Sequence, residues 1–551
     1  MQSDYNDLIL VSGEPTLSDP RIEQTLPQVL EKRVAQYGDK PWVVCGDRSF
    51  GYATVQARSR RLAAGLHDQG VRSGDTVLLM LPDGIEIVYG WCALARLGAI
   101  EISVNTHLRG NVLNHLINDS RAQTGIVHAE FLSRLLPAEP FPRLKKLIVA
   151  GEASEQDRAA AAERYEWVEF DSCFVAEPVT NGIPAPRFND VGAVMYTSGT
   201  TGPSKGVMIT HAHSYEYALA VVELLELKSS DVYYNPLPLF HIAGQWAAVY
   251  ASCIRGASVV LAQGFSARSF WPDVRRHEAT TTFLLGAMAN WLSQADPRDD
   301  DADNPMERML VVPLLPDIES FRKRFDVLVS TTWGSTEINC PTRSGFDLVD
   351  SKTCGHVTED RYEVRIVDED DMEVPTGVPG EAVVRAKEPW IVMAGYWNNP
   401  EATARAWRNQ WVHSGDMLMK DERGNLYFTD RVKDAIRRSG ENISSMEVEN
   451  EINAYPPVTE CAVVPVTSEH TEQEVKAFLV LKEGAGDFDF GDFIRFLEPR
   501  MAYFMVPRYV EIIDALPKTQ TGKIQKFELR ERGNSDATWD RVAAGVVLDK
   551  S

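Results

Sequence analysis

Short apolar runs rich in β-branched residues alternate with amphipathic stretches from about Leu26 to Ser330. The runs lie at Thr76–Met80, Thr124–Val127, Lys146–Val149, Ala257–Leu261, Thr280–Leu284 and Val327–Ser330. Strands that alternate with helices in this way usually form parallel sheets with helices on their faces. We therefore expect helix-covered, mostly parallel sheets in this part of the chain.

The pattern changes twice in the remaining residues. Between Tyr362 and Tyr427, short strand-like segments separated by turns predict a small β-rich subdomain. The polar stretch Arg437–Asn442 then precedes a last set of helix and strand patterns, at Val448–Ala454, Cys461–Val464 and Ala477–Leu481. Because 551 residues exceed what one core usually supports, we predict an α/β protein with at least two domains. The large N-terminal domain spans residues 1–430, and a small C-terminal α+β domain spans residues 434–551.

Composition narrows the possible partners. A net charge of −23 argues against binding nucleic acid or an anionic membrane. The seven cysteines are scattered singly, which suits a reducing cytoplasm. The first residues lack a signal-peptide pattern, and the most apolar stretch, Trp246–Val260, contains Arg255 and is too short to span a bilayer. We expect a cytoplasmic protein, a monomer or homodimer, without a membrane span or a nucleic-acid partner.

One loop carries the strongest chemical signal: Tyr196-Thr-Ser-Gly-Thr-Thr-Gly-Pro-Ser-Lys-Gly-Val207. Glycines let backbone N–H groups point at phosphate oxygens, hydroxyls add donors, and Lys205 supplies a positive charge. A surface turn has a similar composition, but this loop lies between two apolar runs. An ordinary P-loop does not fit, because Lys205 precedes Gly206 rather than a Ser or Thr. The loop therefore predicts a polyphosphate site whose metal ion is held elsewhere.

Two further segments suit a nucleotide. Val329-Ser-Thr-Thr-Trp-Gly-Ser-Thr-Glu-Ile338 offers a flat ring, a glycine that permits close approach and a carboxylate for Mg²⁺. Trp411-Val-His-Ser-Gly-Asp416 and Tyr427-Phe-Thr-Asp-Arg431 place an acid and a base before and after a short hairpin, suited to ribose hydroxyls and phosphate. Taken singly, Trp333 and Glu337 are equally well explained as a core tryptophan and a surface glutamate, and Asp416 and Arg431 are better explained as ordinary surface groups.

Together with Pro236-Leu-Pro-Leu-Phe-His241 and Leu516-Pro-Lys-Thr-Gln-Thr-Gly-Lys523, these segments resemble the motifs of the adenylate-forming superfamily. That superfamily contains acyl-CoA synthetases, luciferases and the adenylation domains of peptide synthetases. The resemblance covers most of the chain. Ala267–Trp271 and Ala394–Trp397 make it most similar to acyl-CoA ligases of the carnitine/crotonobetaine-CoA ligase type.

The resemblance implies a role for each matching residue. Catalysis would involve Lys523, Glu337 as the Mg²⁺ ligand, His241 at the mouth of the acyl pocket, and Lys433 as the hinge (residues 431–433) about which a mobile C-terminal domain turns. The nucleotide, ATP or AMP, would be bound by Thr197, Ser198, Gly199, Thr200, Thr201, Gly202, Lys205, Trp333, Gly334, Thr336, Asp416 and Arg431. A coenzyme A tunnel would be lined by Ser439, Gly440 and Glu441.

The expected reaction is activation of a carboxylic acid as acyl-AMP, followed by transfer to coenzyme A. Peptide-synthetase relatives usually anchor an α-ammonium with an aspartate near the position of His241, so an amino-acid substrate is disfavoured. The substrate pocket would contain His241, Trp246, Gly286 and Trp333, together with Leu285 and Met288. Its apolar character predicts a bulky alicyclic, aromatic or fatty acid.

The sequence departs from the family pattern at Leu310-Val-Val-Pro-Leu314, where glycines are common. β-Branched valines are expected to narrow the approach of nucleotide and acid. Two alternatives to a complete ligase follow from this departure. One is an enzyme that only thioesterifies a supplied acyl-adenylate, and the other is a catalytically silent nucleotide-binding protein.

Overall fold

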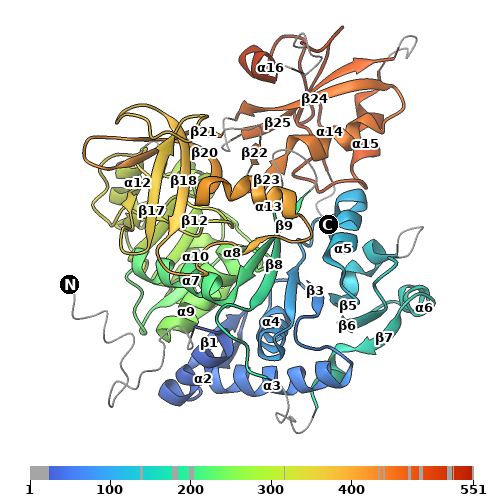
Figure 1. Ribbon diagram of the computed structural model, residues 1–551, viewed down its shortest axis with the longest axis vertical. Coiled ribbons are helices and arrows are strands. Elements are labelled where there is room, and N and C mark those ends of the chain that lie inside the picture. The colour runs from blue at the N-terminus through green and yellow to red at the C-terminus, as the bar shows by residue number, and fades with distance from the viewer. Residues whose placement is uncertain are drawn as a thin grey trace.

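The computed structural model describes residues 24–136, 141–175, 184–197, 204–315, 317–431, 435–438, 441–468, 473–482, 488–517, 524 and 526–548. Two large sheets dominate the N-terminal domain, and the C-terminal domain lies at one end of the molecule, above α5 and β9 (Figure 1). The predicted class, a large α/β domain with a β-rich subdomain and a small α+β domain, is confirmed. The predicted junction at residues 431–433 falls mostly outside the described residues and stays a prediction.

The first large sheet has eight strands and is parallel through its middle. Its order is β19 (Gly395–Tyr396), β9 (Lys205–Thr210), β8 (Val191–Thr197), β4 (Ile100–Ser103), β3 (Thr76–Met80), β5 (Thr124–His128), β6 (Lys146–Ala150) and β7 (Glu166–Glu169). At one edge β9 runs antiparallel to both of its neighbours, β8 and β19. The glycine-rich loop therefore closes a hairpin between β8 and β9.

Helices bury both faces of this sheet. Along β3, Val77 and Leu79 belong to the core shared with α4 (Ile85–Leu97), whereas Leu78 and Met80 pack in the cluster that contains α5 (Gly110–Ser120). Successive side chains of a strand point to opposite faces, so a strand covered on both sides is a continuous apolar run. The predicted strand at residues 76–80 is confirmed with the same bounds.

The second large sheet has seven strands, parallel except at one edge. Its order is β14 (Leu328–Ser330), β13 (Arg308–Val312), β12 (Thr281–Leu285), β10 (Val232–Asn235), β11 (Ser258–Leu261), β1 (Pro41–Cys45) and β2 (Arg48–Gly51). The principal hydrophobic core contains buried side chains of α2 (Leu26–Tyr37), α3 (Tyr52–Asp68), α4, α7 (His211–Leu224) and α9 (Ala251–Arg255). The other α-helices in the described part of the domain are α6 (Glu155–Ala162), α8 (Ile242–Gly244), α10 (Phe270–Arg276), α11 (Gly286–Gln294), α12 (Ile318–Phe325) and α13 (Pro400–Ala406).

The β-rich subdomain is a four-stranded antiparallel sheet. Its order is β17 (Tyr362–Val367), β18 (Gly380–Ala386), β20 (Val412–Lys420) and β21 (Leu426–Arg431). Short antiparallel strands are what the changed rhythm of the sequence predicts for this region.

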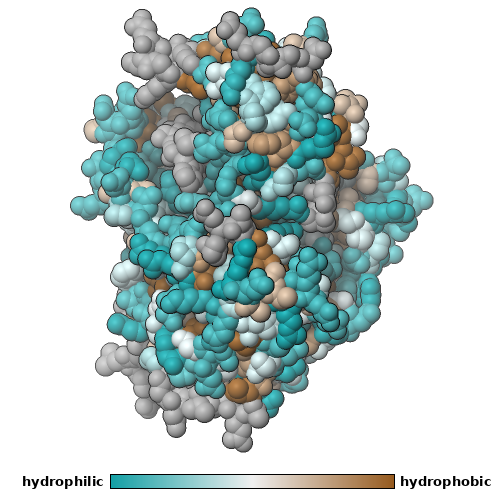
Figure 2. All heavy atoms as spheres, turned by 90° about the vertical axis from the view of Figure 1, so that its right-hand side faces the viewer, coloured by the Kyte–Doolittle hydropathy of each residue, from teal (hydrophilic) through white to brown (hydrophobic). Residues whose placement is uncertain are grey.

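The C-terminal domain begins in the described residues with a hairpin of β22 (Ala435–Arg438) and β23 (Glu441–Ser444). It continues with a sheet of β24 (Val458–Thr467), β25 (Gln473–Leu481), β26 (Tyr509–Ile512) and β27 (Trp539–Asp540) and with helices α14 (Ser445–Asn453), α15 (Phe490–Leu497) and α16 (Lys526–Arg532). Its core also takes in Val112 of α5, so the two domains share apolar packing. The face of the molecule that lies on the right-hand side of Figure 1 is mainly hydrophilic, with hydrophobic side chains in small groups (Figure 2).

None of the described helices is long and apolar enough to cross a membrane.

A buried ion pair holds the start of β13, the strand that ends at the site described below. The Arg308 guanidinium lies 2.7 Å from Asp231, and both side chains are only 4% exposed. The same guanidinium donates to the carbonyl oxygens of Leu225 and Glu226 at 3.0 and 2.6 Å. Removing one partner of such a pair leaves an uncompensated buried charge.

We expect Arg308→Met to lower the free energy of unfolding by about 3–5 kcal/mol, because Asp231 loses its partner. Arg322→Met is the matched control, since Arg322 pairs with a largely exposed Glu319 on the surface of α12 and such pairs contribute about 0–1 kcal/mol. Urea denaturation followed by circular dichroism measures both. Equal losses in the two variants would contradict a structural role for the buried pair.

Candidate active site

A cavity of about 350 Å³ lies where the two large sheets meet the C-terminal domain. Strands β4, β8, β12 and β13 end at this cavity, and their last residues line it: Ser103, Thr197, Leu285 and Val312. Crevices at the carboxyl ends of parallel strands are the usual ligand sites of open α/β sheets. The C-terminal domain adds Arg437, Glu441, Glu447, Phe504 and Met505 to the wall.

Glu337 presents its carboxylate at one side of the cavity. One carboxylate oxygen accepts hydrogen bonds from Tyr396 at 3.1 Å and Thr197 at 3.4 Å, and the other accepts from Ser335 at 3.0 Å. The predicted residues Gly334 and Thr336 line the same wall. A Cβ atom at Gly334 would lie 1.9 Å from the Asn339 carbonyl oxygen, so only glycine fits this turn.

The two ends of the predicted phosphate loop face each other at the cavity. Thr197 ends β8 and pairs with Lys205, which begins β9. The Lys205 ammonium lies 5.0 Å from the centre of the Tyr396 ring, and both ends of the loop line the cavity. The predicted ligands between them, Ser198, Gly199, Thr200, Thr201 and Gly202, lie outside the described residues.

The predicted ribose and adenine residues form a separate buried group beside the cavity. The indole N–H of Trp333 donates to a carboxylate oxygen of Asp416 at 2.9 Å, and the two residues are 5% and 4% exposed. Asp416 of β20 pairs through its backbone with Arg431 of β21, as the hairpin between the two motifs requires. Trp333 and Asp416 are not in the described cavity wall, whereas Ser414 of the same turn is.

Only some of the residues predicted for the acid pocket line the cavity. His241, Leu285 and Met288 line the cavity, together with Leu237, Phe283 and Val312. The described wall does not include Trp246, which is 1% exposed, or Gly286, where a Cβ atom would lie 2.6 Å from the Pro313 carbonyl oxygen. These two residues lie behind the wall instead. Val312 is the valine of the Leu310–Leu314 segment that faces the cavity, whereas Val311 is buried in a different cluster.

Three residue pairs join the C-terminal domain to the N-terminal domain at the site by hydrogen bonds. The Glu441 carboxylate lies 3.0 Å from the Nε2 atom of His241. The Glu447 carboxylate accepts from the Ser204 backbone N–H at 2.6 Å and also from its hydroxyl. Asn111 of α5 donates to Glu451 of α14 at 2.8 Å. The other predicted residues of this region, Lys433, Ser439, Gly440 and Lys523, lie outside the described residues, as does the side chain of Arg431.

The environment sets the charges at this junction. Burial lowers the tendency of His241 to carry a proton, but the charge of Glu441 outweighs it and the pKa of His241 is raised. Burial raises the pKa of Glu447. It also raises the pKa of Asp83 to about 6, although the Leu239 N–H, which donates to that carboxylate at 2.7 Å, opposes the shift. His241 therefore holds a proton more readily than an ordinary histidine, and Glu447 ionises less readily than an ordinary glutamate.

Tyr396, Arg437 and Glu447 are among the residues of the cavity wall that the sequence did not indicate. Each reaches the cavity from a segment distant in sequence from its contacts, and no local motif marks these roles. The only available signal was that Tyr396 and Arg437 lie in stretches already noted for other reasons, Ala394–Trp397 and Arg437–Asn442.

Comparison with known proteins agrees with this geometry. The model of the AMP-binding enzyme family matches residues 30–397, and that of the AMP-binding enzyme C-terminal domain matches residues 447–523. A crotonobetaine/carnitine–CoA ligase of Salmonella paratyphi B is 30% identical over 522 residues, which are 92% of this chain and 99% of that protein.

Among solved structures, a double mutant of o-succinylbenzoate CoA synthetase from Bacillus subtilis, bound to a product analogue, superposes with a TM-score of 0.78 at 24% identity, covering 93% of this chain and 99% of the other. The complex of that synthetase with its acyl-adenylate intermediate superposes with a TM-score of 0.64 at 25% identity and the same coverage. The chain therefore belongs to the AMP-binding, adenylate-forming superfamily, as a relative of its AMP-forming CoA ligases.

Proposed function

We propose that this protein joins a bulky, apolar carboxylic acid to coenzyme A through an acyl-AMP intermediate. A carboxylate oxygen of the acid attacks the α-phosphorus of ATP and pyrophosphate leaves. The coenzyme A thiol, losing its proton, then attacks the acyl carbon and AMP leaves. The observation that carries the proposal is a single cavity with Glu337, Thr197 and Lys205 on one side and Arg437 and Glu441 of the C-terminal domain on the other.

The first step needs the negative charge of the phosphates to be neutralised. Lys205 provides positive charge at the cavity wall, and the loop that it closes is assigned the hydrogen-bond donors to the phosphates. Glu337 and the nearby Thr197 hydroxyl are oxygen donors of the kind Mg²⁺ prefers, and one carboxylate together with substrate phosphates is a common Mg²⁺ site. Magnesium bound there would stabilise the phosphate charge. Lys523 is assigned to the charge that develops at the α-phosphate.

The apolar part of the wall is suited to the acid. Leu237, Phe283, Leu285, Met288 and Val312 present hydrocarbon to the cavity. Small-molecule sites are commonly apolar with a few placed polar groups, and His241 at the rim supplies one of them. Trp246, Gly286 and Trp333 are assigned to support this wall from behind.

We assign the second step, thioester formation, to the arrangement in which the C-terminal domain places Glu441 against His241. Glu441 reaches His241 from β23, beside the proposed thiol tunnel at Ser439 and Gly440. Rotation about Lys433 would then exchange the two arrangements between the steps.

The function is tested with Mg²⁺, ATP, coenzyme A and a panel of carboxylic acids, following pyrophosphate, AMP and acyl-CoA by mass spectrometry. We expect all three products in equal amounts with a bulky apolar acid, and a loss of at least about 100-fold in Lys523→Ala, the scale of one lost charge-stabilising group. Lys482→Ala, at an exposed position of the C-terminal domain, is the control. No turnover of any free acid, with conversion of a supplied acyl-adenylate to acyl-CoA, would replace this function by the thioesterifying one.

We expect Glu441→Gln to slow thioester formation by about tenfold, equivalent to roughly 1.4 kcal/mol, and to change first-turnover pyrophosphate release much less. Because the pKa of His241 is raised by Glu441, the ion pair is complete below the ordinary histidine pKa and is lost as pH rises through the raised value. The ratio of the wild-type rate of thioester formation to that of Glu441→Gln should therefore fall as pH rises. Rapid-quench kinetics across pH measures it, with Glu531→Gln on α16 as control; a pH-independent ratio would contradict the ion-pair role.

Val312→Ala tests the limit on acid size. Removing two methyl groups from the wall should favour a bulkier acid over the wild-type acid by about tenfold in kcat/KM, because one methylene-sized group in an apolar pocket contributes roughly 1–3 kcal/mol. Val311→Ala is the matched control, since its side chain packs away from the cavity. An unchanged acid preference in Val312→Ala would show that the valine does not set it.

A further inference from the structure

A bulge in the β-rich subdomain delivers Asp416 to the site. Glu381 of β18 pairs with Met417 of β20, and Val383 pairs with His413, so β20 has three residues where β18 has one. Gly415, in the middle of these three, has a φ of 73°, a conformation that favours glycine. Bulges of this kind redirect side chains and are frequent beside active sites.

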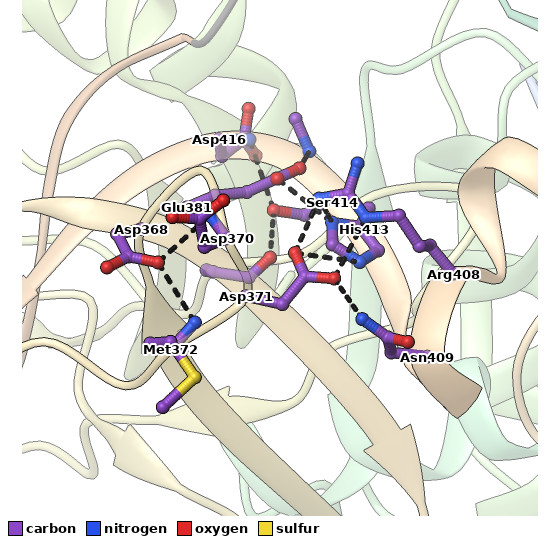
Figure 3. A network of polar contacts seen from close by, with 12 residues as sticks. Asp368, Asp370, Asp371, Met372, Glu381, Arg408, Asn409, His413, Ser414 and Asp416 are labelled. Atoms are coloured by element: carbon purple, nitrogen blue, oxygen red, sulfur yellow. Dashed lines mark hydrogen bonds and ion pairs between the residues drawn. The ribbon is translucent and has the colours of Figure 1, made fainter.

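One carboxylate holds both sides of this bulge. An oxygen of Glu381 accepts from the Gly415 backbone N–H at 3.0 Å, and the other lies 2.9 Å from Nδ1 of His413 (Figure 3). Between them, the Ser414 hydroxyl donates to the Ala382 carbonyl oxygen at 2.6 Å and accepts from the Asp416 N–H at 3.1 Å. These bonds replace the ladder bonds that the extra residues of β20 give up.

A second carboxylate supports the far side of His413. Asp371, in the turn between β17 and β18, lies 3.8 Å from Nε2 of His413 and accepts from Nε of Arg408 at 2.9 Å (Figure 3). The His413 side chain is 8% exposed and that of Glu381 is 19% exposed. Burial opposes ionisation of Glu381, but the hydrogen bonds from His413 and Gly415 hold its pKa below the usual range. The carboxylate is therefore charged and fixed in place.

The bulge fixes the backbone of Asp416, and Trp333 fixes its side chain through the 2.9 Å hydrogen bond from the indole. A carboxylate that must meet two ribose hydroxyls needs both its position and its direction set, because hydrogen bonds weaken steeply with misalignment. Glu381 is not one of the residues that line the cavity.

We propose that Glu381 is a positioning residue for nucleotide recognition: it clamps the Ser414–Asp416 bulge so that Asp416 binds the ribose hydroxyls of the nucleotide. The inference rests on the proposed function, in that Asp416 is taken as the ribose ligand. It adds that discrimination for ribose is set from a residue outside the cavity.

The test compares binding of AMP, 2′-deoxy-AMP and 3′-deoxy-AMP by titration calorimetry in wild type, Glu381→Gln, Asp416→Asn and the double variant. We expect wild type to prefer AMP by about tenfold, as for a hydrogen bond to a charged group. Glu381→Gln should reduce the preference to about threefold or less, because the uncharged amide holds the bulge more weakly. The double variant should prefer AMP over the deoxynucleotides at least as strongly as Asp416→Asn alone does, since both changes act through one contact.

Glu363→Gln is the matched control, because Glu363 pairs with Arg385 on the same sheet and both side chains are more than a third exposed. It should keep the wild-type preference. If Glu381→Gln binds AMP more weakly but keeps that preference, or if wild type does not distinguish AMP from either deoxynucleotide, the proposal is wrong. Melting temperatures of all variants show that the comparison is made on folded protein.

Pyrophosphate release by the same preparations tests the ligase function separately. Ribose discrimination that depends on Glu381 in a protein that never releases pyrophosphate would support the clamp and refute the ligase. Turnover by a Glu381→Gln variant with undiminished ribose discrimination would support the ligase and refute the clamp.

Discussion

The contact of the C-terminal domain with the phosphate-loop end is the constraint on which the rest of the site depends. The Ser204 N–H has one hydrogen to donate, and Glu447 accepts it at 2.6 Å. If a polyphosphate accepts this hydrogen, Glu447 cannot accept it. Binding of such a polyphosphate and the docked position of α14 therefore exclude each other. The same docking brings Glu441 to His241 and closes the cavity with Phe504 and Met505. In this arrangement the C-terminal domain holds the end of the proposed phosphate loop through two hydrogen bonds from Ser204 to Glu447.

Apolar packing makes the docked arrangement more than a set of ion pairs. Val112 of α5 lies in the core of the C-terminal domain, and Gly110 fits against the Arg500 backbone, where a Cβ atom would lie 2.9 Å from the Arg500 carbonyl oxygen. Surface ion pairs alone contribute little, so a shared apolar contact is what makes the position specific. The sheets below, anchored by buried pairs such as Arg308 and Asp231, give this contact a rigid base.

The sequence predicted those parts of the site that are local. The apolar run Thr76–Met80 is β3, Tyr362–Val367 is β17, and Glu337, Lys205, His241 and Glu441 meet at one cavity. Spacing did not indicate which side of the wall Trp246 and Gly286 would take, because most of their neighbours in the chain are apolar. Glu447, Tyr396 and Glu381 were missed because their partners lie far along the chain, and only the fold brings them together.

The central claim is that the acid is activated as acyl-AMP in this cavity. The most direct measurement uses an acid that the protein turns over, labelled with oxygen-18 in its carboxylate, with ATP, Mg²⁺ and coenzyme A. If the carboxylate attacks the α-phosphorus and the thiol later displaces AMP, the AMP must carry one labelled oxygen. Unlabelled AMP, or label in inorganic phosphate, would contradict the account.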